Sequence, residues 1–187
     1  YEIASCLVGS EMCIRDSAVT HWKVPTLEEA LILCKDKIVV NIDKGFQYYG
    51  LIHPLLEKYG MLEQVLIKSN VTADRAAATF SKYDDNCLFM PIVNFGKKSY
   101  RKILESYERL KYPLLAYEIC WSEYTPEVET CMREVIAGGS KLWVNSLWPS
   151  LNGGLCDDAA VEGDPAEVYG KLAVSYTHLT LPTILRV

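Results

Sequence analysis

Polar and charged side chains that could bind an anion or a hydroxylated ligand stand at the ends of several short apolar segments. They are Asp43, Lys44, Lys68, Ser69, Asn94, Glu118, Asn145 and Ser146. If the apolar segments are parallel strands, their carboxyl ends meet at one edge of a sheet, where α/β proteins build their binding and active sites. A ring of carboxylate, ammonium and amide groups suits a metal-bound phosphate or a sugar-like polyol. The spacing therefore predicts a ligand site at this edge.

Three of these segments supply the four predicted substrate contacts, namely Lys68, Glu118, Trp143 and Asn145. Lys68 would bring a positive charge, and Glu118 would accept a hydrogen bond from a hydroxyl or help to hold a cation. Trp143 and Asn145 share one strand face, so Trp143 is predicted to form an apolar wall beside a polyol. The competing interpretations are a solvated lysine, a salt bridge at Glu118 and a core tryptophan. Because neighbouring strand residues face opposite sides, Lys44 is predicted to point away.

The segments that must position these side chains are short, apolar and rich in β-branched residues. The predicted strands are Ile38–Asp43, Gln64–Lys68, Leu88–Val93, Pro113–Ile119 and Lys141–Ser146. Their starts lie about 25 residues apart, and amphipathic helical segments lie between them. This alternation predicts parallel strands joined by right-handed crossovers.

Helix start signals support the same alternation. Thr26 followed by Glu29 forms a capping box that predicts a helix through Cys34. Thr125 and Pro126 supply an N-cap and a proline at the first helical position, and glycines close that helix at Gly138. Asp164 and the proline after it repeat the signal.

Two architectures use such a repeat, an open doubly wound sheet and a closed (β/α)8 barrel. The glycine-rich first turn that marks a nucleotide-binding open sheet is absent from the sequence. The predicted fold is therefore an α/β fold of the (β/α)8 TIM-barrel type. About five βα units are present, so the first two strands and the last strand are expected to be missing.

The composition of the chain argues against two classes of binding partner. The net charge is −5 and no basic run occurs, which argues against nucleic acid and anionic membranes as partners. No apolar run is long enough for a membrane span. The scattered cysteines form no C-x-x-C pair and are predicted to be reduced, buried thiols. His21 and His53 are predicted not to be catalytic.

Both ends of the chain resemble translations of opposite strands of one sequencing adapter, through LVGSEMCIRDS at 7–17 and VSYTHLTLPT at 174–183. Residues 1–17 and 174–187 are therefore expected to be adapter-derived, and 18–173 to be a partial barrel domain from a natural gene. A natural amino terminus is not expected in the chain, which leaves cytoplasmic and secreted or periplasmic locations both open.

Three segments resemble the glycerophosphodiester phosphodiesterase family, in the order that the family has them. VPTLEEALILC at 24–34 is similar to the family's helix of the form I-P-T-L-E-E-x-L. VVNIDKG at 39–45 resembles the strand that carries N-[IV]-E-[IV]-K. LWVNSLWPSLNGG at 142–154 resembles the penultimate barrel strand and its loop.

This resemblance implies metal-dependent hydrolysis of a glycerophosphodiester to glycerol 3-phosphate and an alcohol, with Ca²⁺ or Mg²⁺ as cofactor. Asp43 matches the third carboxylate ligand, which is usually glutamate in the family, so Asp43 is the predicted metal residue. Gly45 stands where the family has a lysine, which puts that phosphate contact in doubt. The two acid–base histidines lie outside the resembling segment, so the chain itself is expected to be an inactive fragment.

Two other functions are compatible with these residues. A barrel that binds a phosphorylated polyol without cleaving it would also tolerate Gly45 in place of the family's lysine and Asp43 in place of the family's glutamate. An aldolase or isomerase barrel would use Lys68 as its amine, although the ordered motifs argue against it.

Overall fold

The computed structural model describes residues 11–13, 19–83, 87–110 and 114–174. Its centre is a five-stranded, all-parallel sheet in which the strand order follows the chain order. The strands are β3 (Val40–Ile42), β4 (Val65–Ser69), β5 (Leu88–Asn94), β6 (Ala116–Cys120) and β7 (Lys141–Val144). All five therefore end at the same edge of the sheet.

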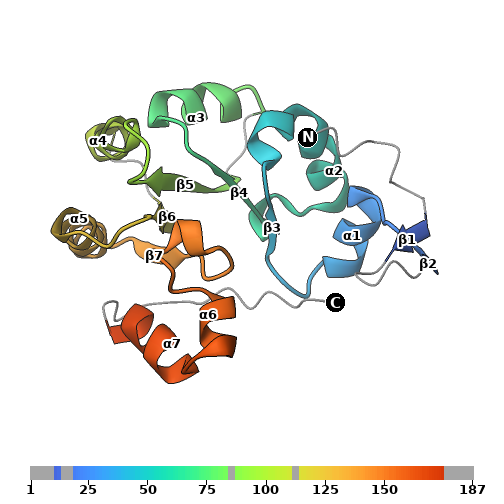
Figure 1. Cartoon of the computed structure of the whole chain (residues 1–187). Helices are drawn as coiled ribbons and strands as arrows, with labels where there is room; N and C mark the ends of the chain where they lie inside the picture. The colour runs from blue at the N-terminus through green and yellow to red at the C-terminus, as the bar shows by residue number, and fades with distance from the viewer. Residues whose placement is uncertain (1–10, 14–18, 84–86, 111–113, 175–187) are drawn as a thin grey trace.

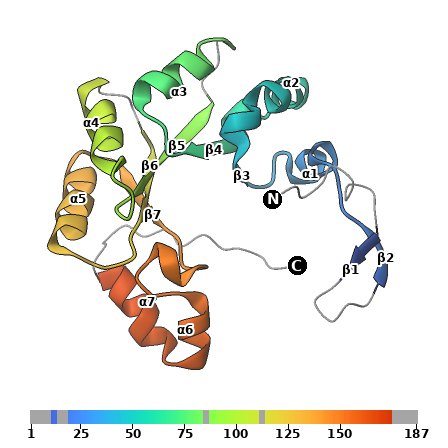
Figure 2. The same ribbon diagram turned by 45° about the horizontal axis from the view of Figure 1, so that its top comes forward.

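Helices follow the strands and supply the crossovers. They are α1 (Leu27–Cys34), α2 (Tyr49–Tyr59), α3 (Ala73–Phe80), α4 (Tyr100–Leu110), α5 (Pro126–Ala137), α6 (Asp157–Glu162) and α7 (Pro165–Val174), with short 3₁₀ turns at Gly45–Tyr48, Leu62–Gln64 and Pro149–Leu151. In Figure 2, α2, α3, α4 and α5 form an arc along one side of the curved sheet. The parallel α/β alternation predicted from the sequence is confirmed, and a closed barrel is not part of the described structure.

Strand alternation separates the two faces of the sheet. Val65 and Ile67 of β4 are fully buried in the core beneath the helices. Leu66 and Lys68 of the same strand point to the opposite face, where Leu66 packs with Met90 in a smaller apolar cluster. The face away from the helices therefore carries the charged group at the carboxyl end of β4.

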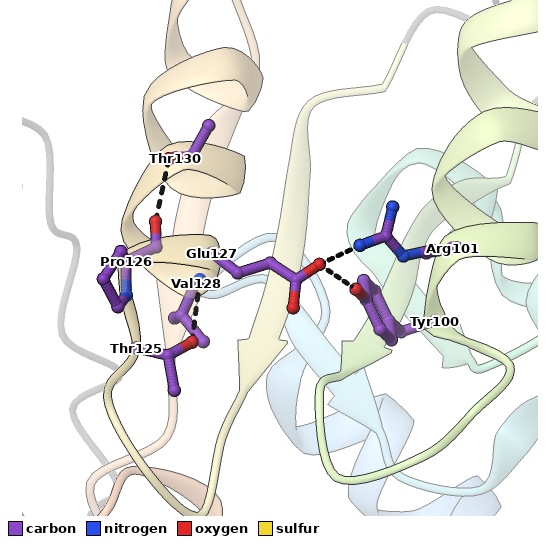
Figure 3. Close-up of polar contacts among 7 residues, drawn as sticks. All are labelled: Tyr100, Arg101, Thr125, Pro126, Glu127, Val128 and Thr130. Carbon is purple, nitrogen blue, oxygen red and sulfur yellow. Dashed lines mark hydrogen bonds and ion pairs between the residues drawn. The ribbon is translucent and has the colours of Figure 1, made fainter.

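Neighbouring helices in the arc are also joined to each other at their ends. Glu127 in the first turn of α5 accepts hydrogen bonds from the hydroxyl of Tyr100 and the guanidinium of Arg101 in α4 (Figure 3). Thr125 caps the same helix by accepting from the Val128 amide at 3.4 Å. The hydrogen bond that the Tyr100 hydroxyl donates to the Glu127 carboxylate raises the pKa of Tyr100.

Two predicted helix starts have the geometry expected of them. The Thr26 hydroxyl accepts from the Glu29 amide at 3.1 Å while the Glu29 carboxylate accepts from the Thr26 amide at 2.7 Å, so the capping box is formed. Pro126 is the first residue of α5. The capping box satisfies amide groups that a helix end leaves without a partner, and Pro126 has no amide N–H that would need one.

The strand bounds differ from the predicted ones mainly at the ends. β3 begins at Val40 although Ile38 and Val39 were expected to join it, and both of those side chains are exposed. Among the described residues β3 has a neighbouring strand only on its β4 side. Ile38 and Val39 therefore have no second strand with which to form backbone hydrogen bonds. A small antiparallel pair, β1 (Glu11–Cys13) and β2 (Val19–Lys23), was not predicted and lies apart from the sheet (Figure 1).

Some residues named in the sequence predictions lie outside the described ranges. Pro113, the predicted start of the fourth strand, lies outside them. So do most of the adapter-like ends at 1–17 and 174–187. No helix within the described ranges is both long and apolar enough to cross a bilayer.

Candidate binding cleft at the carboxyl edge of the sheet

Lys68 is the centre of the charged group at this edge. Its ammonium nitrogen lies 2.8 Å from Oε2 of Glu118 in β6 and 4.0 Å from Oδ1 of Asp43 after β3. Lys68 and Glu118 are almost completely buried, whereas the Asp43 side chain is 69% exposed. The structure thus brings together three of the five side chains that were predicted as site residues, from three different strands.

The Lys68–Glu118 contact is an ion pair without the alignment of a hydrogen bond, since Glu118 Oε2 makes no hydrogen bond. Two buried charges stabilise each other only while both are present, because each has lost its hydration. The thiol of Cys120 lies against the same carboxylate, 3.9 Å from Oε1. Burial, and secondarily the negative charge of Glu118, raise the pKa of Cys120 to about 12.

A cleft of about 720 Å³ opens beside this group, between the loops that follow β3 and β4. Asp43 and Lys68 line it together. Its other lining residues are Lys44, Phe46, Gln47, Tyr49, Gly50, Ser69, Asn70, Val71, Arg75, Thr79, Tyr83 and Ile92. A volume of this size is typical of a site for a small organic ligand.

Lys44 lines the cleft, which corrects the prediction that it points away. β3 ends at Ile42, so the strand alternation on which that prediction rested has stopped. The Lys44 backbone is left-handed, with φ of 55°. Such a conformation is uncommon for a residue with a side chain, and it is frequent at functional sites.

A side chain at Gly45 would require its neighbours to shift. A Cβ atom there would lie 2.9 Å from Cδ1 of Ile67 and 3.0 Å from Cγ2 of Ile42. Both isoleucines pack in or against the core beneath the helices. A side chain at position 45 would therefore begin in the core, so the lysine that the phosphodiesterase motif has there would not reach the cleft directly.

Trp143 and Asn145 are not lining residues of the cleft. Trp143 is paired in register with Glu118, but it packs against the apolar cluster of Leu66, Met90 and Ala116. It lines a small apolar cavity of about 180 Å³ toward the amino ends of the strands. Its predicted contact with a substrate stays a prediction.

Asn145 instead organises the loop after β7. Its side-chain oxygen accepts from the Leu147 amide at 2.9 Å, and its backbone carbonyl accepts from Nδ2 of Asn152 at 2.7 Å. Asn152 is fully buried and forms an isolated bridge with Trp121 beyond the end of β6. Asn152 Oδ1 and Trp121 Nε1 are both buried without a hydrogen-bond partner. These hydrogen bonds of the loop were not predictable from the sequence.

The residues at this edge offer a divalent cation only part of a ligand set. Asp43 is an accessible carboxylate, the oxygen donor that Ca²⁺ and Mg²⁺ prefer. Glu118 is already paired with Lys68. Within the described part of the chain, no group of three or more His, Cys, Asp or Glu side chains is placed to hold a metal. Asp43 alone is not a metal site, so further ligands would have to come from elsewhere.

Neither His53 nor His21 is among the described residues that line the cleft. His53 is buried in α2, where its ring contacts those of Tyr49 and Tyr83. His21 lies in β2, which belongs to the separate two-stranded sheet.

The buried thiols should resist alkylation. Burial raises the pKa of Cys120 and of Cys131 to about 12, so both stay protonated, and only the thiolate reacts. Iodoacetamide at pH 8 followed by peptide mass mapping should leave both unmodified in the folded chain and modify both in denaturant. The pKa of each folded thiol exceeds the ordinary value of 9.0. The contribution of these two protonated thiols to the free energy of unfolding is therefore complete below about pH 9 and is lost toward pH 12. Rapid labelling of the folded chain would contradict this assignment.

The described structure defines an α/β protein with a parallel sheet and a charged cleft at its carboxyl edge. A family model, DUF4996, described as a domain of unknown function, matches residues 89–179. The match begins within β5 and so leaves Asp43 and Lys68 outside it. No curated protein matches the chain.

Proposed function

We propose that the chain is part of a (β/α)8 barrel of the glycerophosphodiester phosphodiesterase type. Such an enzyme hydrolyses a glycerophosphodiester to glycerol 3-phosphate and an alcohol with the help of Ca²⁺ or Mg²⁺. Residues 18–173 would supply about five βα units, and the remaining units would carry the acid–base histidines. The chain by itself would then bind substrate without cleaving it.

The convergence of Asp43, Lys68 and Glu118 at one edge of a parallel sheet is the observation that carries this proposal. These residues come from separate strands and were singled out by their positions at strand ends. Lys68 faces the cleft beside Asp43, so an anionic phosphodiester entering there meets an ammonium group. Glu118 holds that ammonium in place and keeps its buried charge balanced.

A divalent cation bound at this edge would supply charge to polarise the phosphoryl group and to neutralise developing negative charge. Asp43 would hold the cation through a carboxylate oxygen, and Lys68 would orient a phosphoryl oxygen. Glu118 would act through Lys68.

Exchange of Asp43 for asparagine should lower phosphodiesterase activity about 10- to 100-fold in the full-length parent protein, with little change in stability, because the side chain is exposed. Release of glycerol 3-phosphate from glycerophosphodiesters measures the activity. Asp74→Asn is the matched control, since Asp74 is also exposed but pairs with Arg109 outside the cleft. Full activity of Asp43→Asn would remove Asp43 from the proposed metal site.

A second candidate, a barrel that binds a phosphorylated polyol without hydrolysis, is favoured by the packing at Gly45. The lysine of the phosphodiesterase motif would have to displace the side chains of Ile67 and Ile42 there. Sequencing the parent gene outward from residues 18 and 173 separates the two candidates. A frame with His-Arg-Gly, Glu-x-Asp and a second histidine supports hydrolysis, whereas an intact frame without the histidine pair supports binding alone.

A further inference from the structure

We infer that the cleft prefers glycerophosphodiesters whose alcohol moiety carries its own negative charge over those that carry a quaternary ammonium group. This inference rests on the proposed function and specifies its substrate class. It comes from the charges, hydrogen-bonding groups and aromatic rings that line the cleft.

The cleft has a surplus of positive charge. Among the residues that the structure describes, Lys44, Lys68 and Arg75 line it, and Asp43 is the one lining carboxylate. The charge of Lys68 is balanced from below by Glu118 at 2.8 Å. Lys44 and Arg75 then share the described lining with Asp43, in a chain whose net charge is −5. The positive potential is therefore local to the cleft and is not a property of the whole surface.

Arg75 is placed to act as the anion-binding group. It lies in the first turns of α3, next to the loop after β4. That loop is held by α4, because Ser106 accepts from the Ala73 amide at 2.9 Å and the Tyr107 hydroxyl donates to the Val71 carbonyl at 3.1 Å. The acid beside Arg75, Asp74, is paired with Arg109 at 3.0 Å. A guanidinium binds phosphate or carboxylate through two parallel hydrogen bonds.

Neutral polar groups complete the lining and suit a hydroxylated alcohol. Gln47, Ser69, Asn70 and Thr79 all border the cleft. Amide and hydroxyl side chains both donate and accept hydrogen bonds, so they can pair with the hydroxyls of a polyol ring. About 720 Å³ leaves room for such a ring with a further phosphate.

The aromatic residues of the cleft do not form an open cage for a quaternary ammonium. Such a cation is recognised over the exposed faces of several rings. Here Tyr49 is only 1% exposed and makes edge contacts with Phe80 and Tyr83, at 4.9 and 5.3 Å between ring centroids. Phe46 packs edge-on against Phe80 at 5.7 Å. These rings are engaged with one another, and the cations beside them repel a cationic ligand.

The test is isothermal titration calorimetry of the full chain with glycerophosphoinositol 4-phosphate, glycerophosphoinositol and glycerophosphocholine. We expect affinity to fall in that order, with about a tenfold difference between the first and the last probe, and the difference to shrink as salt screens the charges. Equal affinities, or tighter binding of the choline compound, would overturn this inference and leave the proposed function standing. Binding of none of the three would overturn both.

Arg75→Gln supplies the residue-level test, with Arg133→Gln as the control outside the cleft. Both arginines are exposed, so neither exchange should unfold the chain. Arg75→Gln should reduce the preference for the phosphorylated inositol to about threefold or less, and Arg133→Gln should leave it unchanged. An unchanged preference in Arg75→Gln would exclude Arg75 as the anion-binding group.

Discussion

Replacing Glu118 with alanine is expected to lower the free energy of unfolding by about 3–5 kcal/mol. The exchange leaves the buried ammonium of Lys68 without its partner at 2.8 Å. Asp43 is too far, at 4.0 Å, and too exposed to replace that partner. An uncompensated buried charge costs more than the pair contributes, because desolvation of the ammonium is no longer offset.

Urea unfolding followed by circular dichroism measures this effect, with Glu123→Ala, an exposed glutamate in the next loop, as control. The double exchange Lys68→Met with Glu118→Leu should recover most of the loss, since apolar side chains of similar volume often replace a buried ion pair without cost. A loss below about 1 kcal/mol in Glu118→Ala would show that water reaches Lys68 and that the pair is effectively exposed.

Gly45→Ala is expected to destabilise the chain by about 1–3 kcal/mol, the usual cost of overpacking a core. The new Cβ would lie 2.9 Å from Ile67 Cδ1 and 3.0 Å from Ile42 Cγ2. The Ile67 methyl can rotate away in part, but the branch of Ile42 is held close to its backbone. Thermal unfolding measures the loss.

Gly170→Ala is the matched control for this exchange. Gly170 lies in α7, and a Cβ there would meet no atom of the described residues within 4 Å. Alanine at that position should stabilise the chain by about 0.5–1 kcal/mol through helix propensity. Ile67→Val, which removes the contacting methyl, should reduce the cost of Gly45→Ala when the two are combined. No cost at Gly45 would mean that the loop after β3 shifts freely.

The helix and strand pattern was predictable because its signals are local. A capping box at Thr26 and a proline after Thr125 depend on residues within one turn, and both formed as predicted. The extent of β3 was not predictable, since Ile38 and Val39 are good strand residues whose pairing depends on a neighbouring strand. The β1–β2 pair falls in a segment that was interpreted as partly non-natural.

The candidate site was predictable only as far as strand ends determine it. Lys68, Glu118 and Asp43 meet because parallel strands end at one edge. Lys44 was misplaced because a left-handed turn interrupts the alternation on which the prediction relied. Arg75 was not predicted at all, since it lies on a helix and reaches the cleft only through the packing of the β4–α3 loop.

The strand order of the sheet has a consequence for how the chain forms during synthesis. β3 to β7 pair strictly in the order in which they are translated. Each strand that leaves the ribosome therefore finds its partner already made, and none of the described pairings has to wait for a distant downstream segment. Since domains assemble from the amino-terminal side at the pace of translation, the ion pair between β4 and β6 closes only once β6 has emerged, and Lys68 stays hydrated until then.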